Sequence, residues 1–475
     1  MDWQEGVVGR RTLRLSLRAG LAAILLTFAA CVWAVLTPGV GAETPKDGAS
    51  APSATTPVAS PSAPAPKVHE SFVAPGTEPS IAADPFHPGV VAVVSENLTF
   101  PSGHICSQPA VRISQDGGVS WRSATYPWGP LCEGIHAVIA WGPGGRLWAT
   151  DAVGLSGGMA VSVTYSGNLG KTWAKPYVER RTPAWVGCYP SIAVDNNPGS
   201  TDLGSVYVAF NWPESSQGPG VAVMASVDGK TWAMTKVPVV TLTSGYPAYD
   251  RIGYHITPVR DDGSGVSAWV SFYQADLQSW NPKAVLDEGS SSNVGRRVLA
   301  VTDLVFDHVP GRKPTLTYAR GGTSIAISSK SLDRWQTSLA WGGTDDGRTW
   351  WAAGSANGAV LLAHHLPDGQ IATRRLTLPG KSSFKPSIAA ASNIVFVGWH
   401  ATDSAGRVWT YYSLSYDGGQ TFSPPALVTK STWFEPAVLN GVGLRENACI
   451  GSGVIYYAYG DNRAGTGIYV ARIQP

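Results

Sequence analysis

One short motif recurs along the chain and constrains its fold more than any other feature. Each copy runs from Ser or Thr through Asp or Asn and Gly to an aromatic residue, which is the chemistry of a hairpin corner. The acidic or amide side chain accepts backbone N–H bonds, glycine takes a positive φ, and the aromatic ring packs over the hairpin. We therefore expect the motif residues to be structural. Full copies span 114–121, 166–173 and 415–422, and shortened copies span 226–232 and 344–350. The key residues are Asp116, Trp121, Asn168, Trp173, Asp228, Trp232, Asp346, Trp350, Asp417 and Phe422.

A second repeat marks the start of a strand. The sequence EPSIA at 78–82 is echoed by YPSIA at 189–193 and KPSIA at 385–389, with a looser echo, EPAV, at 435–438. Proline is tolerated at the first position of a strand, where its missing donor falls at an end. Weaker equivalents begin near His136, Ile252 and Ser324. Two further strands, the turn motif and a fourth strand follow each opener, so the repeating unit has four strands.

Repeated four-stranded units of this length predict an all-β fold, a β-propeller. The 54 Gly and 35 Pro residues suit short strands and tight turns. We favour seven blades. Six is the alternative if the units at 252 and 324 form one blade, with 274–300 as an insertion. The short last unit is expected to be completed by a strand near 68–73, which closes the ring and removes exposed edges.

The chain divides into three regions. Residues 1–42 carry four arginines (Arg10, Arg11, Arg14 and Arg18) followed by an apolar run at 21–36. This pattern is typical of a signal peptide, with an uncleaved membrane anchor as the alternative. Residues 43–66 form a Pro/Ala/Ser-rich linker that cannot build a core, so disorder is expected there. The propeller then occupies 67–475. We expect a secreted or surface-tethered protein that meets a membrane only through an uncleaved N-terminal segment.

The cysteines and the net charge indicate which disulfide bonds are expected and which cofactors and partners are not. Outside the signal segment the chain has Cys106, Cys132, Cys188 and Cys449, and four cysteines allow three pairings. Export makes disulfides expected, and we favour Cys106–Cys132, which closes a short loop and leaves Cys188 with Cys449. The absence of a CxxC motif argues against a metal site, and no cofactor is expected. The net charge of +2 argues against a nucleic-acid partner.

The turn motifs resemble those of the Asp-box (BNR-repeat) propellers, the superfamily that includes the sialidases. The resemblance covers nearly all of 67–475 and implies that the motifs sit at blade corners. Sialidases use an arginine triad, a Tyr nucleophile with a Glu partner, and an Asp acid/base, and their first arginine lies in a Phe/Tyr-Arg-Ile-Pro motif near the start of the domain. Here no arginine lies between 67 and Arg112, and the nearest match is DRIG at 250–253, without the proline. The catalytic residues are therefore left unassigned.

A ligand site is expected where the inner strands begin, around the central channel. Carboxylates brought together there raise one another's pKa and can form an acid/base pair, and the cationic side chains can receive an acidic group. The alternative is a solvated rim in which the charges neutralise one another. In the last blade, Asp461-Asn462-Arg463 predicts a strand-end turn with a local ion pair. The candidate ligand-binding residues are Glu78, Glu133, Tyr189, Asp250, Arg251, Lys385 and Glu435.

These patterns leave three functions open. The first is a monomeric exported propeller that binds a glycan or an extracellular protein at its channel mouth without catalysis; the lack of the first arginine motif favours it. The second is a divergent glycoside hydrolase of exo-sialidase type, favoured by the carboxylates and Arg251 at the predicted mouth. The third is a scaffold for an exported complex, which the linker and the balanced charge favour.

Overall fold

The computed structural model of the protein describes much of the chain from residue 65 onward. The residues outside the description are 1–64, 100–105, 108, 127–130, 133–134, 156–157, 180–189, 215–217, 238–246, 250–254, 259–267, 278–294, 309–311, 319–322, 326–337, 342–348, 367, 369, 430 and 435–445. The described part is built from antiparallel strands and contains no α-helix, only a 3₁₀ turn at Pro143–Gly145. None of its helical segments is long and apolar enough to cross a membrane.

The strands form successive antiparallel sheets, most of them four-stranded. The first comprises β2 (Thr77–Ala83), β3 (Val91–Glu96), β6 (Ala110–Ser114) and β7 (Arg122–Ala124), and the second β9 (Ile135–Gly142), β10 (Arg146–Leu155), β11 (Gly158–Ser166) and β12 (Tyr177–Val178). The third comprises β13 (Ser191–Val194), β14 (Val206–Glu214), β15 (Gly218–Ser226) and β16 (Ala233–Val237). The next contains β17 (Pro247–Tyr249), β18 (His255–Pro258), β19 (Ala268–Leu277), β20 (Gly295–Asp307), β21 (Thr315–Tyr318) and β22 (Thr323–Ile325).

The remaining sheets complete the chain. One comprises β23 (Ser338–Trp341), β24 (Trp350–Ala356), β25 (Ala359–His365) and β26 (Ile371–Leu376), and the next β27 (Ser382–Ala391), β28 (Ile394–Thr402), β29 (Arg407–Ser415), β30 (Ala426–Leu427) and β31 (Trp433–Phe434). The last comprises β32 (Asn447–Gly451), β33 (Val454–Asp461), β34 (Gly467–Gln474) and β1 (Lys67–Pro75). A small extra sheet joins β4 (Leu98–Thr99), β5 (Cys106–Ser107) and β8 (Leu131–Cys132).

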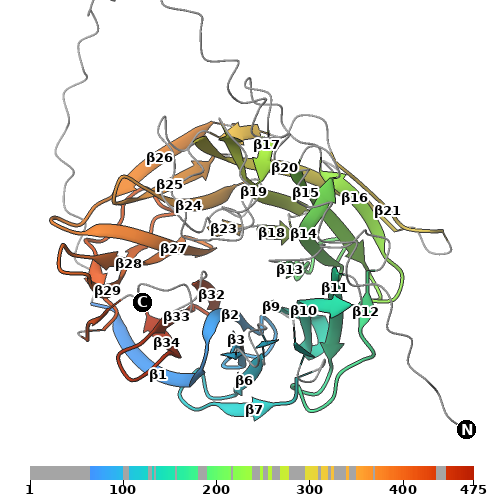
Figure 1. The fold of residues 1–475 in the computed structure, drawn as a ribbon, viewed down its shortest axis with the longest axis horizontal. Coiled ribbons are helices and arrows are strands. Elements are labelled where there is room, and N and C mark those ends of the chain that lie inside the picture. The colour runs from blue at the N-terminus through green and yellow to red at the C-terminus, as the bar shows by residue number, and fades with distance from the viewer. Residues whose placement is uncertain are drawn as a thin grey trace, which may run out of the picture. The chain divides into compact units, whose positions relative to one another are not determined.

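The innermost strands of these sheets form a closed ring. In chain order they are β2, β9, β13, β18, β23, β27 and β32, and each contacts the next, while β32 returns to contact β2. Figure 1 shows the sheets following one another around a common centre. In most sheets the inner strand leads outward through a meander to the fourth strand, whereas in the last sheet β1 takes the fourth place.

The ring is closed by strands from the two ends of the described chain. Strand β1 pairs antiparallel with β34, from Lys67 opposite Gln474 to Pro75 opposite Gly467. The predicted closing strand near 68–73 is therefore confirmed. This pairing removes the free edge that β34 would otherwise present.

The hydrophobic core lies between the faces of neighbouring sheets. Val94 and Ile113 of the first sheet pack against Trp141 and Leu147 of the second. Since both faces of the middle strands are covered, these strands are continuously apolar rather than alternating, as in the VAVV run that opens β3. Burial of one such Val, Leu or Ile side chain contributes about 1.5–3 kcal/mol.

Four copies of the turn motif close the hairpin between the third and fourth strands of a sheet. In the β6–β7 hairpin, Asp116 Oδ1 accepts N–H bonds from Val119 at 3.1 Å and Ser120 at 2.9 Å. Ser114 Oγ donates to Asp116 Oδ1 and accepts from the Gly118 N–H, both at 2.7 Å. The same acceptor position is held in the other three hairpins by Asn168, Asp228 and Asp417.

The aromatic and glycine positions of the motif link each hairpin to its surroundings. Trp121 Nε1 donates to Ser71 Oγ of β1 at 3.0 Å, so the first hairpin is attached to the closing strand. Gly229 has φ +72, and a Cβ there would lie 2.6 Å from the Trp148 ring of the preceding sheet. Trp173 donates to the Thr125 carbonyl, Trp232 donates to the Gly229 carbonyl of its own hairpin, and the Phe422 ring packs edge-on against Trp351.

Two sequence assignments prove wrong in this part of the chain. The motif copy at 344–350 does not join third and fourth strands, because Trp350 is the first residue of β24, the second strand of its sheet; Asp346 lies outside the described residues. Likewise, the strand at Ser324 does not open a sheet: β22 pairs with β20 of the preceding sheet, and the inner strand of the next sheet is β23. A local sequence pattern of this kind carries no information about which strands of a sheet it connects or opens.

The structure describes three of the four cysteines that follow the signal segment. Cys106 and Cys132 are directly opposed partners in the β5–β8 pairing. Cys449 of β32 is a free thiol in the structure, and Cys188, its expected partner, lies outside the described residues.

Candidate functional site

Three of the inner strands, β2, β9 and β27, share an unusual backbone feature near their starts. Glu78, His136 and Lys385 have φ values of 51°, 79° and 49°, in the left-handed region that non-glycine residues rarely adopt. At each of these positions the pairing with the second strand shifts register, which is a β-bulge. A bulge redirects a side chain that would otherwise alternate regularly along the strand. A residue held in such a conformation costs about 1–3 kcal/mol, and residues of this kind are concentrated at functional sites.

The first side-chain cluster joins the β2 and β9 sheets. His136 Nδ1 contacts the Glu78 carboxylate, and the Glu96 carboxylate at the end of β3 accepts the backbone N–H groups of His136 and, at 2.9 Å, of Ala137. Glu78, Glu96 and His136 are only 5%, 1% and 4% exposed. One potential ligand atom from each lies within 4.8 Å of the others. Three charged or chargeable groups from two sheets therefore share one buried volume.

A tyrosine–carboxylate pair lies beside this cluster. Tyr126 donates its hydroxyl to the Asp151 carboxylate on β10, which is fully buried. Burial raises the pKa of Tyr126 well above its ordinary value, and the negative charges of Asp151 and Glu96 add to the effect. Tyr126 therefore remains a neutral hydrogen-bond donor at physiological pH.

The second cluster lies at the β27–β32 side of the ring. His400 Nε2 is 3.1 Å from Glu446 Oε1, and Thr410 Oγ1 is 3.0 Å from His400 Nδ1. Burial lowers the pKa of His400 well below its ordinary value, and the nearby positive charge of Lys385 lowers it further. Glu446 Oε2 also accepts the Gly460 N–H at 3.1 Å. Neutral His400 can then donate through Nε2 to Glu446 and accept from Thr410 at Nδ1.

A third group joins the closing strand to the last sheet. Arg463 NH2 lies 2.7 Å from Glu70 Oε1, and Arg463 Nε lies 2.8 Å from Asp461 Oδ2. The same guanidinium donates through NH1 to Thr429 Oγ1 at 2.8 Å. Burial raises the pKa of Asp461 to about 6 although Arg463 opposes the shift. The predicted ion pair within 461–463 is confirmed, and it extends to a residue almost 400 positions away.

The structure describes two of the candidate ligand-binding residues. Glu78 and Lys385 are both buried, at 5% and 3% exposure, so neither lies on a solvated rim. Glu78 contacts His136 in the first cluster, whereas Lys385 lies close enough to His400 to lower its pKa in the second. The others lie outside the described residues: Glu133, Tyr189, Asp250, Arg251 and Glu435.

Several clustered residues were missed from the sequence. Glu96, Asp151, His400 and Asp461 occupy corresponding places on the second strands of their sheets, next to where the inner strand begins. Each is a single polar residue that follows a mostly apolar run, as in IVFVGWH for His400. A polar residue at that point of a buried strand is the signal that would have identified them, because such a residue needs a partner.

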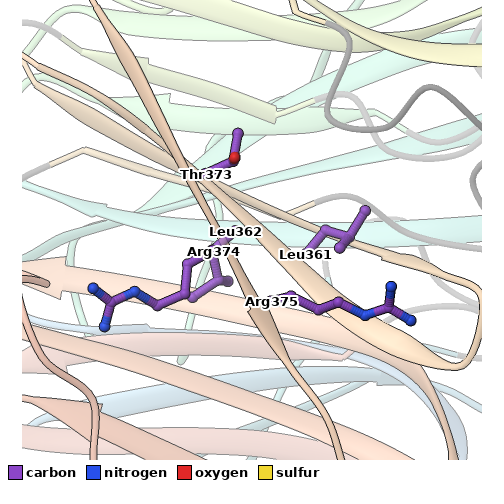
Figure 2. A pocket seen from close by; sticks show the side chains of 5 residues that line it. All are labelled: Leu361, Leu362, Thr373, Arg374 and Arg375. Atoms are coloured by element: carbon purple, nitrogen blue, oxygen red, sulfur yellow. The ribbon is translucent and has the colours of Figure 1, made fainter. Parts of the chain in front are cut away.

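A shallow hollow of about 160 Å³ lies elsewhere, between β25 and β26. In Figure 2 the guanidinium groups of Arg374 and Arg375 point away from each other. They donate to the backbone carbonyls of Gln420 at 2.6 Å and Asn357 at 3.1 Å. The two arginines therefore hydrogen-bond to different neighbouring segments and do not converge on a ligand. The lining residues are Leu361, Leu362, Thr373, Arg374 and Arg375.

The closed ring of antiparallel sheets, with polar clusters at the starts of its inner strands, defines the described region as a β-propeller. No protein-family model matches the chain, and no curated protein matches it.

Solved structures that resemble the chain include a GH93 α-L-arabinofuranosidase of Fusarium graminearum with arabinobiose, at 12% identity and TM-score 0.42, covering 68% of this chain and 87% of that one. An ulvan lyase of polysaccharide lyase family PL25 has 12% identity and TM-score 0.44, covering 84% and 94%. The endosialidase of phage phi92 has 11% identity and TM-score 0.42, covering 86% and 69%. Similarities at this level identify neither a substrate nor a reaction for this chain.

Proposed function

We propose that this protein is an exported Asp-box propeller of seven blades that binds a glycan where its inner strands begin, without catalysing a reaction on it. The N-terminal segment supports export, and the turn motifs support the Asp-box assignment. The sialidase-like character of those motifs leads us to a glycan as the ligand. We further propose that the protein acts as a monomer.

One observation supports the non-catalytic part of the proposal. The described carboxylates beside the inner strands are buried and bind partners within the protein. Glu96 accepts two backbone N–H groups, Glu446 accepts from His400 and Gly460, and Glu78 contacts His136. A glycosidase needs one carboxylic acid and one carboxylate that reach the two faces of the bond to be broken. Carboxylates 5% exposed or less do not reach a sugar without rearrangement.

The ligand contacts are proposed to come from residues that the sequence places at strand starts. Arg251 suits an acidic sugar, because its guanidinium can form a two-point contact with a carboxylate. Tyr189 suits the apolar face of a sugar ring. Glu133, Asp250 and Glu435 supply hydrogen-bond acceptors for hydroxyl groups. The buried clusters would hold the described strand starts rigidly.

The test combines a glycan array with a panel of fluorogenic glycosides, sialosides included. We expect binding to a restricted set of glycans, loss of that binding in Arg251→Ala and Tyr189→Ala, and no turnover. Arg374→Ala is the matched control, because this arginine lies on β26, the outermost strand of its sheet. Turnover by the wild-type protein that disappears in Arg251→Ala would contradict the non-catalytic proposal. Failure of the folded protein to bind any glycan would contradict the choice of ligand.

A divergent glycoside hydrolase is the second candidate, and one distance favours it. The carboxylates of Glu78 and Glu96 contribute oxygens that lie within 4.8 Å of each other. Retaining glycosidases place their two carboxyl groups about 5–5.5 Å apart. If this pair is catalytic, the glycoside panel shows turnover that falls by at least about 100-fold in both Glu78→Gln and Glu96→Gln while Glu446→Gln retains it. A turnover unaffected by these changes would remove the pair from consideration.

A further inference from the structure

We infer that Glu78, Glu96 and His136 form a binding site for one divalent transition-metal ion, with Zn²⁺ as the best fit, that clamps the first two sheets of the ring together. The inference is independent of the proposed glycan binding. It rests on the type, spacing, burial and fixation of the three side chains.

The donor set has the chemistry of a transition-metal site. One imidazole nitrogen and two carboxylate oxygens lie within 4.8 Å of one another, the spacing of atoms that share one ion. Zinc is bound in proteins by His nitrogen and Asp or Glu oxygen at about 2.0–2.2 Å, and three protein ligands leave a fourth position for water. Calcium takes six to eight oxygen ligands, which a site with one nitrogen and two carboxylates does not match.

Charge and burial add to the attraction for a cation. Even with the imidazole protonated, these three groups together carry a net charge of −1. They are 5%, 1% and 4% exposed, and the Coulomb attraction of an ion for them is stronger there than in water. Removal of such groups from water is costly unless they are paired or bind a metal.

The protein also holds the ligands in place before an ion arrives. Backbone N–H groups of His136 and Ala137 fix one oxygen of Glu96, as outer hydrogen bonds do in metal sites. The left-handed backbone at Glu78 and His136 directs both side chains from their bulges toward this point. The ligands come from β2, β3 and β9, which are strands rather than loops, so their positions are well defined.

The second cluster provides a matched control inside the same molecule. His400 and Glu446 are also a buried His–Glu pair between neighbouring sheets, with Nε2 and Oε1 3.1 Å apart. No third ligand-type residue groups with them within the described part of the chain. A buried His–Glu contact is therefore present in both clusters, whereas the second carboxylate of a metal-type triad is grouped with it only in the first.

The experiment uses the full chain treated with a chelator and then dialysed. Titration calorimetry with Zn²⁺ is expected to show one ion per chain, and the ion should raise the melting temperature. Glu96→Gln keeps an acceptor for the two N–H groups but loses the charge, and we expect it and Glu78→Gln each to weaken binding at least about 10-fold. Glu446→Gln should bind as the wild type does.

Two results would overturn the inference. The first is no binding by the folded wild-type protein at about 1 mM Zn²⁺. The cluster would then be a Glu78–His136 contact with Glu96 beside it and would hold no ion. The second is equal affinity in the wild type and both Glu variants. Co²⁺ provides a readout that needs no variant, since its visible spectrum distinguishes nitrogen and oxygen ligation from cysteine ligation. A thiolate spectrum would assign the ion to cysteines, and tighter binding of Ca²⁺ than of Zn²⁺ would exclude the transition-metal assignment.

Discussion

His400 Nε2 and Glu446 Oε1 lie 3.1 Å apart between two neighbouring sheets, and neither side chain has solvent-exposed surface. Glu446→Ala would leave the N–H groups of His400 and Gly460 without this acceptor, at a cost of about 1–3 kcal/mol each. Glu446→Gln retains an acceptor oxygen, so its loss of stability should be clearly smaller. Urea denaturation of the three proteins measures the difference. Equal midpoints for the Ala and Gln variants would mean that the pair does not stabilise this junction.

Asp116 should stabilise its hairpin through the hydrogen bonds that its carboxylate accepts. The side-chain and backbone hydrogen bonds from Ser120 lower the pKa of Asp116 from 3.8 to about 2. We expect Asp116→Ala to destabilise by about 1 kcal/mol, as for loss of a helix-capping side chain. Asp116→Asn should cost less, because Asn168 accepts the equivalent N–H bond in the next sheet.

The pH dependence of this aspartate has a defined direction. Because its pKa is lower in the folded chain, the contribution of Asp116 is complete above about pH 3.8 and is lost as the pH falls through about 2. Thermal melts across that range should show a shallower dependence in Asp116→Asn than in the wild type. Identical dependence in the two proteins would contradict the role of the carboxylate charge.

His364 should make stability depend on pH in mildly acidic solution. Burial, with a contribution from the charge of His365, lowers the pKa of His364 from 6.5 to about 4. The unfolded chain therefore gains a proton between these values that the folded chain does not, so stability is highest above about pH 6.5 and declines toward pH 4.

The variant His364→Phe tests this expectation. Phenylalanine can keep the stack on Trp351, whose ring centroid is 3.9 Å away, and it does not titrate. The melting temperature of the variant should change less than that of the wild type between pH 6.5 and 4. His69→Gln, at an exposed histidine of β1, is the control and should follow the wild type. Parallel curves for all three proteins would argue against His364 as the source.

The cysteines should divide into a bonded pair and a protected thiol. Cys106 and Cys132 are opposed across antiparallel strands, where Cα atoms are about 4.5–5.5 Å apart and a disulfide can form. Burial raises the pKa of Cys449 to about 12, so at pH 8 it carries almost no reactive thiolate. Peptide mapping without reductant should find the Cys106–Cys132 link, and alkylation should reach Cys449 only after unfolding. A Cys188–Cys449 peptide, or labelling of Cys449 in the folded protein, would contradict this assignment.

Much of the fold could be predicted from the sequence because it is encoded locally. The hairpin motif around Asp116 contains its own acceptor, its own glycines and its own packing aromatic, and the structure has the expected hydrogen bonds. The closing strand near 68–73 followed from an incomplete last unit and the need to cover a sheet edge. The motif at 344–350 was misplaced because the same turn chemistry serves a hairpin between any two adjacent strands.

The site was predictable only in part. The proline and the apolar run that follow Glu78 and Lys385 were enough to place both residues near the start of an inner strand. Where their side chains lie, and which partners they contact, depends on how the sheets pack against one another. His136 is 58 positions from Glu78 and Glu446 is 46 from His400, so each pair exists only once neighbouring sheets have packed. The bulges that direct Glu78 and His136 into the protein also arise from this packing, because a left-handed backbone at a non-glycine residue is unfavourable until surrounding contacts stabilise it.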